Sequence, residues 1–290
     1  MDLELTVRPA RPEDLERITE FTQDTWGPGS SDHVPAAFPA WLEEESGIVL
    51  VAELGGRVIG VVHGEDQGNG EMWCEGMRVA PEARSQGIAS RLQAELNRRA
   101  QAQGFRVWRL ATGYWNEAAH RAAAHNDLRV VHTLTGWKAD PIRGGELPDL
   151  ASVPRMQPGA LIGLDGWRFV SGRNFKPERM KADQAFIGDP DAWALVRVRT
   201  RAGRDGPRLV VGHVEGEGDR RLELLAALRA HAAAKGCTSV RLWWPKGDNL
   251  PAHAGYEIIR EGEPARPVAV LVFEGSVPPP GAPAQPGSRD

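Results

Sequence analysis

The sequence predicts a layered α/β (α+β) fold that is built twice along the chain. Apolar segments such as 47–54 and 71–80 alternate with amphipathic segments such as 88–104, a pattern typical of a mixed sheet covered by helices. The segment 92–110 also recurs, with eight identical residues, at 224–242. We therefore expect a mixed central sheet flanked by helices in each half.

Local signals place the first elements of the first half. Pro12 suits the first turn of a helix, with Glu13 and Asp14 at its positive end. The pair Gly55 and Gly56 predicts a compact hairpin between two apolar runs. The elements expected here are a strand at 3–10, helices at 11–26 and 34–45, and strands at 47–54, 57–66 and 71–80.

A periodic helix and three shorter elements complete the first half. Ile88, Leu92 and Leu96 recur every four residues, and Gly104 supplies the glycine that commonly follows a helix. These features predict a helix over 88–104. The elements expected after it are a strand at 105–111, a helix at 116–126 and a strand at 128–134.

The repeat divides the chain into domains. Its two copies keep the pattern of strand, helix and strand, but Gly87 and Ala89 of the first copy correspond to Asp219 and Arg221 of the second. The segment 141–160 is rich in Pro and Gly and is expected to be a linker, and 276–290 is expected to be a disordered tail. The predicted domains are therefore 1–140 and 161–275.

Composition excludes several classes of partner and site. The 290 residues include 35 basic and 39 acidic ones, so a net charge of -4 gives no global attraction to nucleic acid or to an anionic membrane. Neither a signal peptide nor a spanning helix is expected, which favours a cytoplasmic protein. The two cysteines, Cys74 and Cys237, exclude a disulfide framework and a cysteine-based zinc cage, and no metal is expected. Cys74 is expected to be a buried strand thiol.

The turn between the strand at 71–80 and the helix at 88–104 has the chemistry of an anion site. A helix begins with backbone N–H groups that lack intrahelical partners, and its dipole favours negative charge there. Gly87 allows close approach to the backbone, Ala89 adds little bulk, and Ser85 and Ser90 supply hydroxyl donors. The segment lacks the Gly-Lys-Ser/Thr of a P-loop and the three glycines of a dinucleotide fingerprint. An ordinary strand-to-helix turn is the alternative.

The segment "MRVAPEARSQGIASRL" (77–92) resembles motif A of the GCN5-related N-acetyltransferases (GNAT). Arg84, Gly87 and Ala89 fill that family's Gln/Arg-x-x-Gly-x-Gly/Ala pattern, and the resemblance extends over about residues 3–140. It implies that the turn binds the diphosphate of acetyl-CoA and that the second copy is a degenerate domain of the same family. The cofactor-binding residues implied are Met77, Val79, Arg84, Ser85, Gln86, Gly87, Ile88, Ala89, Ser90 and Asn116.

The family chemistry requires a group that can deprotonate an amine. Glu75 and Glu71 precede the cofactor-binding residues on one strand, and alternation places both on the same face unless a bulge intervenes. Glu75 is the preferred base or amine anchor, with Glu71 as the second candidate. A solvated strand charge or a salt-bridge partner is the alternative for each of them.

The general acid and the acceptor contacts are less well defined. Many family members carry a tyrosine seven residues after the helix-starting Asn, but here that position is Ala123. His120 and Tyr114 are the nearest substitutes, with His125 beyond them, and a thiolate can also depart without an acid because thiols have a pKa of about 8.5. The family fold further implies that the loop with Trp26 borders the acceptor pocket.

We therefore expect an N-acetyltransferase that transfers acetyl directly from acetyl-CoA to a primary amine of a small molecule, for example an amino acid. The tandem arrangement and "EGMRVAP" (75–81) also resemble the vertebrate histidine N-acetyltransferases. A monomer or homodimer is expected, with neither nucleic acid nor membrane as a partner. The alternative function is an acyl-CoA-binding or regulatory module without turnover.

Overall fold

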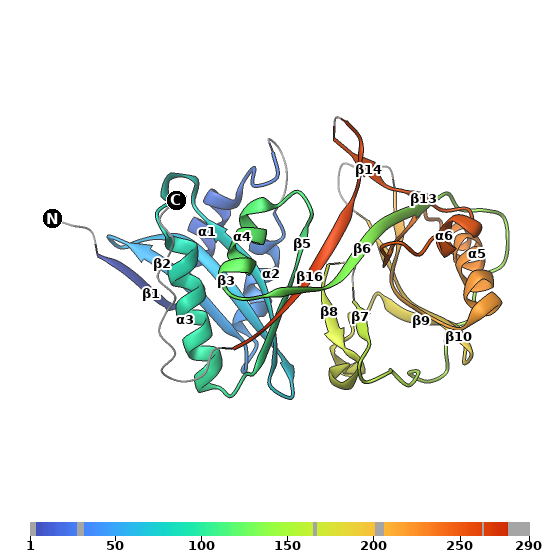
Figure 1. Ribbon diagram of the computed structural model, residues 1–290, viewed down its shortest axis with the longest axis horizontal. Helices are drawn as coiled ribbons and strands as arrows, with labels where there is room; N and C mark the ends of the chain where they lie inside the picture. Colours follow the sequence, from blue (N-terminus) through green and yellow to red (C-terminus); the bar gives the residue numbers. More distant parts are fainter. Residues whose placement is uncertain (1–3, 28–31, 165–166, 201–205, 263, 278–290) are drawn as a thin grey trace. The chain divides into compact units, whose positions relative to one another are not determined.

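The computed structural model describes residues 4–27, 32–164, 167–200, 206–262 and 264–277. Contacts within the chain group into two units (Figure 1). The first unit comprises Met1–Leu110, His120–Arg129 and Glu274–Asp290, and the second comprises Ala111–Ala119 and Val130–Phe273. Each unit contains its own strands and helices.

The first unit is built on a mixed sheet with the strand order β1-β2-β3-β4-β5. β1 to β4 pair antiparallel with their neighbours, and β4 pairs parallel with β5. Gly55 and Gly56 both adopt positive φ at the β2–β3 turn, as the hairpin signal predicts. The strands are β1 (Leu5–Pro9), β2 (Ile48–Leu54), β3 (Arg57–Gly68), β4 (Glu71–Val79) and β5 (Val107–Gly113).

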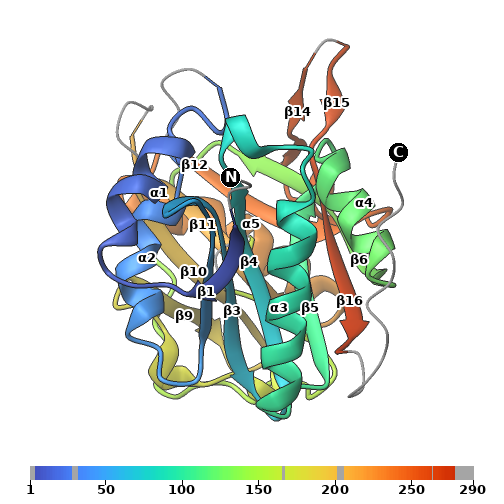
Figure 2. The same ribbon diagram turned by 90° about the vertical axis from the view of Figure 1, so that its left-hand side faces the viewer.

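Helices cover both faces of this sheet. They are α1 (Asp14–Thr22), α2 (Val34–Leu42) and α3 (Ile88–Ala102), with a 3-10 turn at Pro81–Ala83; α4 (Glu117–His125) spans the boundary between the two units. α3 lies over the strands in Figure 2, and its Leu96 packs against Gly64 of β3. His63, which precedes Gly64 in β3, stacks on Trp41 of α2. Because neighbouring strand residues point to opposite faces, α2 and α3 lie on opposite sides of β3.

A bulge interrupts β4 just after Glu75. Val61 pairs with Arg78, whereas His63 pairs with Glu75, so β4 contains one residue more than β3 over this stretch. The extra residue falls at Gly76, whose φ is +68°. Between Glu71 and Glu75 the alternation of β4 continues, because the other register shift adds its residue to β3. The two glutamates therefore lie on the same face, as expected.

The second unit repeats the strand and helix pattern of the first. β9 (Gln184–Asp189), β10 (Ala192–Arg199) and β11 (Arg208–Glu215) pair antiparallel, and β11 pairs parallel with β12 (Ser239–Pro245). When 132 is added to the residue numbers, β5 coincides with β12 and α3 falls within α5 (Gly218–Ala234). The strand order is β16-β6-β12-β11-β10-β9. A mixed sheet with flanking helices in each half is thus confirmed.

The core of the second unit packs around α5. Leu224, Leu225 and Leu228 of this helix are buried against strand residues such as Leu209 and Leu242. The remaining elements are β6 (Arg129–Ala139), β7 (Leu161–Gly163), β8 (Phe169–Ser171), α6 (Leu250–His253), β13 (Glu257–Ile258), β14 (Arg260–Glu261), β15 (Arg266–Pro267) and β16 (Ala269–Ser276), with 3-10 turns at Gly172–Asn174 and Pro177–Arg179.

Some element ends differ from the sequence prediction. α1 begins at Asp14 and ends at Thr22, so it is shorter than 11–26, because the buried Asp14 side chain is held by Arg8. β6 runs to Ala139 and is longer than 128–134, because its far end pairs with β12. The predicted linker 141–160 is irregular, yet Leu150 N–H donates to Phe186 O of β9. Residues 278–290 of the predicted tail lie outside the described residues.

Candidate active site

The turn before α3 exposes the start of that helix. Gly87 is the N-terminal capping residue, with φ +74°, and Ser85 also has positive φ at +60°. No atom lies within 4 Å of the position that a Cβ on Gly87 would occupy. No side chain caps the first turn of α3, which also contains no acidic residue. Its free amides therefore suit a phosphate or diphosphate, and the residues present fit the group that the resemblance implies.

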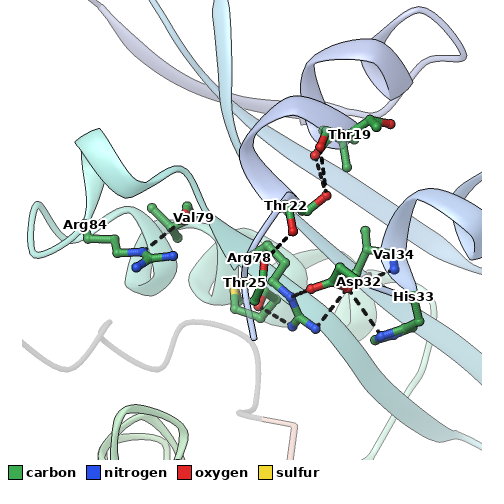
Figure 3. A network of polar contacts seen from close by, with 11 residues as sticks. Thr19, Thr22, Thr25, Asp32, His33, Val34, Arg78, Val79 and Arg84 are labelled. Atoms are coloured by element: carbon green, nitrogen blue, oxygen red, sulfur yellow. Dashed lines mark hydrogen bonds and ion pairs between the residues drawn. The ribbon is translucent and has the colours of Figure 1, made fainter. Parts of the chain in front are cut away.

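The predicted cofactor residues group around this helix start. Arg84, Ser85, Gln86 and Ser90 are exposed, whereas Ile88 is buried and Ala89 is half-buried. Arg84 donates from Nε to the carbonyl of Val79 at 3.4 Å (Figure 3). Val79 and Met77 are half-buried at the end of β4. The structure thus brings together the predicted residues from 77 to 90.

The corresponding helix start in the second unit has different chemistry. Asp219 lies in the first turn of α5. Arg221 donates from Nε to the carbonyl of Gly216 at 2.7 Å, and Arg220 pairs with Asp189. The first turn of α5 therefore carries an acidic side chain, which the first turn of α3 lacks.

An ion pair attaches the segment before α2 to β4. Arg78 donates from Nε to Asp32 Oδ2 at 2.7 Å and from Nη2 to Oδ1 at 3.2 Å (Figure 3). Burial is the largest single influence and opposes ionisation of Asp32, but the hydrogen bond and charge of Arg78, the Val34 N–H and His33 together outweigh it and lower the pKa of the carboxyl. Trp26, predicted to border the acceptor pocket, is 53% exposed and lies 5.2 Å from the Arg78 guanidinium. Trp26 is therefore stacked on a residue of the strand that carries Glu75.

Glu75 belongs to a cluster of side chains beside the bulge. Its Oε1 lies 3.3 Å from Nδ1 of His63, and Oε2 of Glu44 lies 3.1 Å from Nε2 of the same ring. His63 is buried and stacks on Trp41 with ring centroids 4.6 Å apart. The Glu75 side chain is 22% exposed, so part of it reaches solvent. Sequence reasoning missed His63 and Glu44; the available signal was a histidine inside the apolar run 57–66.

Glu71 has a different environment. Its carboxylate is buried and receives a hydrogen bond from Arg109 Nη1 at 2.8 Å, while Arg109 Nε donates to Glu274 at 2.8 Å. The Glu71 side chain is 9% exposed, against 22% for Glu75, so an acceptor amine would reach Glu71 less readily. This geometry favours Glu75 over Glu71 as the base.

The residues around α4 have local contacts of their own. Asn116 caps this helix, since Ala119 N–H donates to its Oδ1 at 3.2 Å. Tyr114 packs edge-on against Trp115 at 5.2 Å. Both Tyr114 and Asn116 belong to the second unit, and His120 is half-buried within α4. Their roles as acid or cofactor ligand stay predictions.

Cys74 is buried, as the sequence predicts, and burial raises the pKa of its thiol to about 12. Its neighbour Glu75 adds to that rise. A thiol in this state is a poor nucleophile at neutral pH, which favours direct transfer over an acetyl-cysteine intermediate. Among the described residues, no group of three or more His, Cys, Asp or Glu is arranged to hold a metal, and none of the helices is long and apolar enough to span a membrane.

Comparison with known proteins finds a family match over part of the chain. Residues 15–126 match the sequence model of the acetyltransferase (GNAT) family. The GNAT fold extends over the full length: a GCN5-related N-acetyltransferase from Sphaerobacter thermophilus has a TM-score of 0.59 at 12% identity, covering 97% of this chain and 98% of that one. A candidate acetyltransferase from Thermoplasma acidophilum gives 0.62 at 18% identity, covering 93% and 99%.

The GNAT domain also resembles curated relatives over part of its sequence. A histidine N-acetyltransferase from Scomber australasicus is 37% identical over 81 residues, or 28% of this chain. The corresponding protein from Oreochromis niloticus is 35% identical over the same length. The chain spans only 23% of the length of these relatives. The similarity supports the family, while the acceptor belongs to the proposal below.

Proposed function

We propose that this GNAT protein transfers an acetyl group from acetyl-CoA to the primary amine of a small molecule, with an amino acid as the favoured acceptor class. One observation carries the proposal. β4 presents Glu75 beside its bulge and then leads, through the turn at 84–87, to the open start of α3. A base and a diphosphate site are thereby fixed to one continuous backbone segment.

The cofactor turn would hold acetyl-CoA by its diphosphate. The first-turn amides of α3 and the hydroxyls of Ser85 and Ser90 are donors, and the exposed Arg84 supplies a positive charge. The Arg84 guanidinium rests on the carbonyl of Val79 through one long hydrogen bond, which is weak enough to be exchanged for a phosphate. Acetyl-CoA supplies the activated acyl group as a thioester.

Glu75 would act on the amine. An attacking nitrogen must be neutral, and its N–H bond must break as the new C–N bond forms and the C–S bond of the thioester breaks. We assign the departing proton to the carboxylate of Glu75, and the electron pair of the C–S bond leaves with the sulfur. The partial exposure of this carboxylate allows contact with an acceptor, directly or through water.

Two arguments favour an amino acid. An α-amine has a pKa of about 7.8 and loses its proton far more readily at pH 7 than a lysine side chain with a pKa of about 10.4. Two curated relatives that are similar over part of this domain are histidine N-acetyltransferases. Free histidine is therefore the first acceptor to assay.

Release of free CoA thiol from acetyl-CoA tests the proposal. The assay would compare histidine, other amino acids, polyamines, aminoglycosides and peptides, with N-acetylhistidine as a matched control that lacks the free amine. We expect amine-dependent thiol release and an acetylated product of the correct mass. Binding of CoA without release on any amine would instead favour the acyl-CoA-binding module.

A further inference from the structure

His63 occupies an unusual position between two carboxylates. Its ring is 1% exposed, with Glu44 Oε2 at 3.1 Å from Nε2 and Glu75 Oε1 at 3.3 Å from Nδ1. An ionised carboxylate only accepts hydrogen bonds, and a neutral imidazole has only one N–H to donate. A neutral imidazole between two ionised carboxylates could therefore make only one of these hydrogen bonds. Both contacts can be hydrogen bonds only if the cluster binds one additional proton.

The extra proton belongs on the imidazole. At ordinary values imidazole has a pKa of about 6.5 and a carboxyl group about 4.3, so the ring binds the proton more tightly. Burial is the largest single influence and lowers the pKa of His63, but the hydrogen bonds and the negative charges of Glu44 and Glu75 together outweigh it and raise the pKa above its ordinary value. Two uncharged residues also lie beside His63: Trp41 of α2 stacks on the face of its ring, and Val49 of β2 is its strand partner.

Only one carboxylate oxygen of Glu75 takes part in the hydrogen bonds of this cluster. Within the described residues, Oε1 of Glu75 accepts from His63, and Oε2 makes no hydrogen bond to the protein. Gly76 follows at φ +68°, and Trp41 fills the space next to Gly76. A carboxylate held at one oxygen has little freedom to rotate, which fixes the orientation of the second oxygen.

We propose that His63 is a positioning residue, an imidazolium that clamps Oε1 of Glu75 so that Oε2 faces the acceptor amine, with Glu44 as the counter-ion that keeps the ring charged. This inference rests on the proposed function of Glu75. In the transfer step the amine N–H bond breaks and an O–H bond forms at Oε2, while His63 keeps both of its protons. The cluster carries a net charge of -1 before that step, which suits an ammonium group.

The protonation state of His63 is tested first, without any assay of activity. The protein labelled with ¹⁵N at histidine would be titrated by NMR, with His63→Phe used to assign the signal. We expect both ring nitrogens to carry protons at pH 7 and the ring to lose one only above the pH at which ordinary histidines do. A single N–H at pH 7 would overturn the proposal.

Steady-state kinetics tests the positioning role. His63→Phe keeps a ring to stack on Trp41 but removes both donors, so kcat should fall about tenfold to a hundredfold with the KM for acetyl-CoA unchanged. His33→Phe is the matched control, because His33 touches another edge of Trp41 at 6.3 Å without contacting Glu75, and its kcat should stay at the wild-type value. Wild-type kcat in folded His63→Phe would refute the role.

Glu44→Gln provides a milder variant that should fold, since Glu44 is one third exposed. Removal of this carboxylate lowers the pKa of His63, so the imidazolium is lost at lower pH. We expect kcat of Glu44→Gln to begin falling, relative to wild type, at a lower pH on the alkaline side. If the pH profile of kcat for Glu44→Gln coincides with that of the wild type, the positioning role of His63 is contradicted. This variant provides the test of that role if His63→Phe does not fold. Absence of turnover in the wild type would defeat the proposed function alone, because the NMR titration still reports on His63.

Discussion

The indole of Trp41 occupies the space beside Gly76, so that a Cβ on this glycine would lie 2.5 Å from the ring. Gly76 is also the residue with φ +68° in the bulge that follows Glu75. The Trp41 indole therefore packs against the bulge that directly follows Glu75. Only glycine satisfies both the backbone conformation and the close contact.

Gly76→Ala is expected to destabilise the protein by about 2 to 4 kcal/mol, because positive φ and overpacking against Trp41 both add a cost. Gly56→Ala is the matched control, since Gly56 has φ +82° but nothing within 4 Å of a Cβ, and it should cost only about 1 to 2 kcal/mol. Urea unfolding measures both values. Equal losses in the two variants would contradict the packing argument.

Gly87→Glu places a side chain and a negative charge at the open start of α3. Loss of even two charge-assisted hydrogen bonds removes about 3 to 6 kcal/mol of binding, so CoA affinity should fall at least about a hundredfold. Gly236→Glu is the control, because Gly236 also has positive φ and open space but lies after α5. Titration calorimetry measures the CoA affinity of the two folded variants. Equal CoA affinity in both would refute the assigned diphosphate site.

The second unit should not bind CoA. Asp219 sets a carboxylate in the first turn of α5, where a diphosphate would need positive potential. Titration calorimetry with wild-type protein should therefore give one CoA site per chain, and Gly87→Glu should remove that site. Two equivalent sites would be inconsistent with this account of α5.

The ion pair of Asp32 and Arg78 should make stability depend on pH. Because the folded state lowers the pKa of Asp32, its contribution is present above the unfolded carboxyl pKa of about 3.9 and is lost as pH falls through the folded value. Asp32→Asn should cost about 3 kcal/mol or more at pH 7, and the gap to wild type should narrow below pH 4. Glu20→Gln, which breaks an exposed pair with Arg17, should shift stability by less than about 1 kcal/mol. A gap for Asp32→Asn that is constant with pH would argue against the pair.

The sequence supports the fold and the cofactor turn better than it supports the catalytic cluster. Periodicity and glycine signals are local, so the helix at 88–104, the hairpin at Gly55 and Gly56, and the repeat at an offset of 132 could all be predicted. The cluster of Glu44, His63 and Glu75 could not, because it joins the segment after α2 to two strands through contacts between residues far apart in the sequence. The register shift at Gly76, which brings Glu75 opposite His63, has no reliable signature in a single sequence.

The ion pair of Glu71 illustrates the same limit. Strand alternation correctly places Glu71 on the same face as Glu75, but it gives no information about Arg109, which lies on a neighbouring strand and neutralises Glu71. Two glutamates that look equivalent in the sequence thus differ in burial and in partner. Structure is needed to separate a candidate base from a buried ion-pair residue.

The central claim is that Glu75 accepts the proton of the bound amine, and Glu75→Gln tests it most directly. The amide keeps the shape but cannot take the proton, so kcat should fall by about 10² to 10⁴ while acetyl-CoA affinity stays nearly intact. An acceptor amine with a pKa near 8 supplies its own neutral form by about pH 9, so much of the deficit should disappear there, whereas a lysine-like amine would recover little. The decisive measurement is therefore kcat of wild type and Glu75→Gln between pH 7 and 9. A deficit at pH 7 that shrinks toward pH 9 is the predicted result, and wild-type kcat at pH 7 in the folded variant would contradict the account.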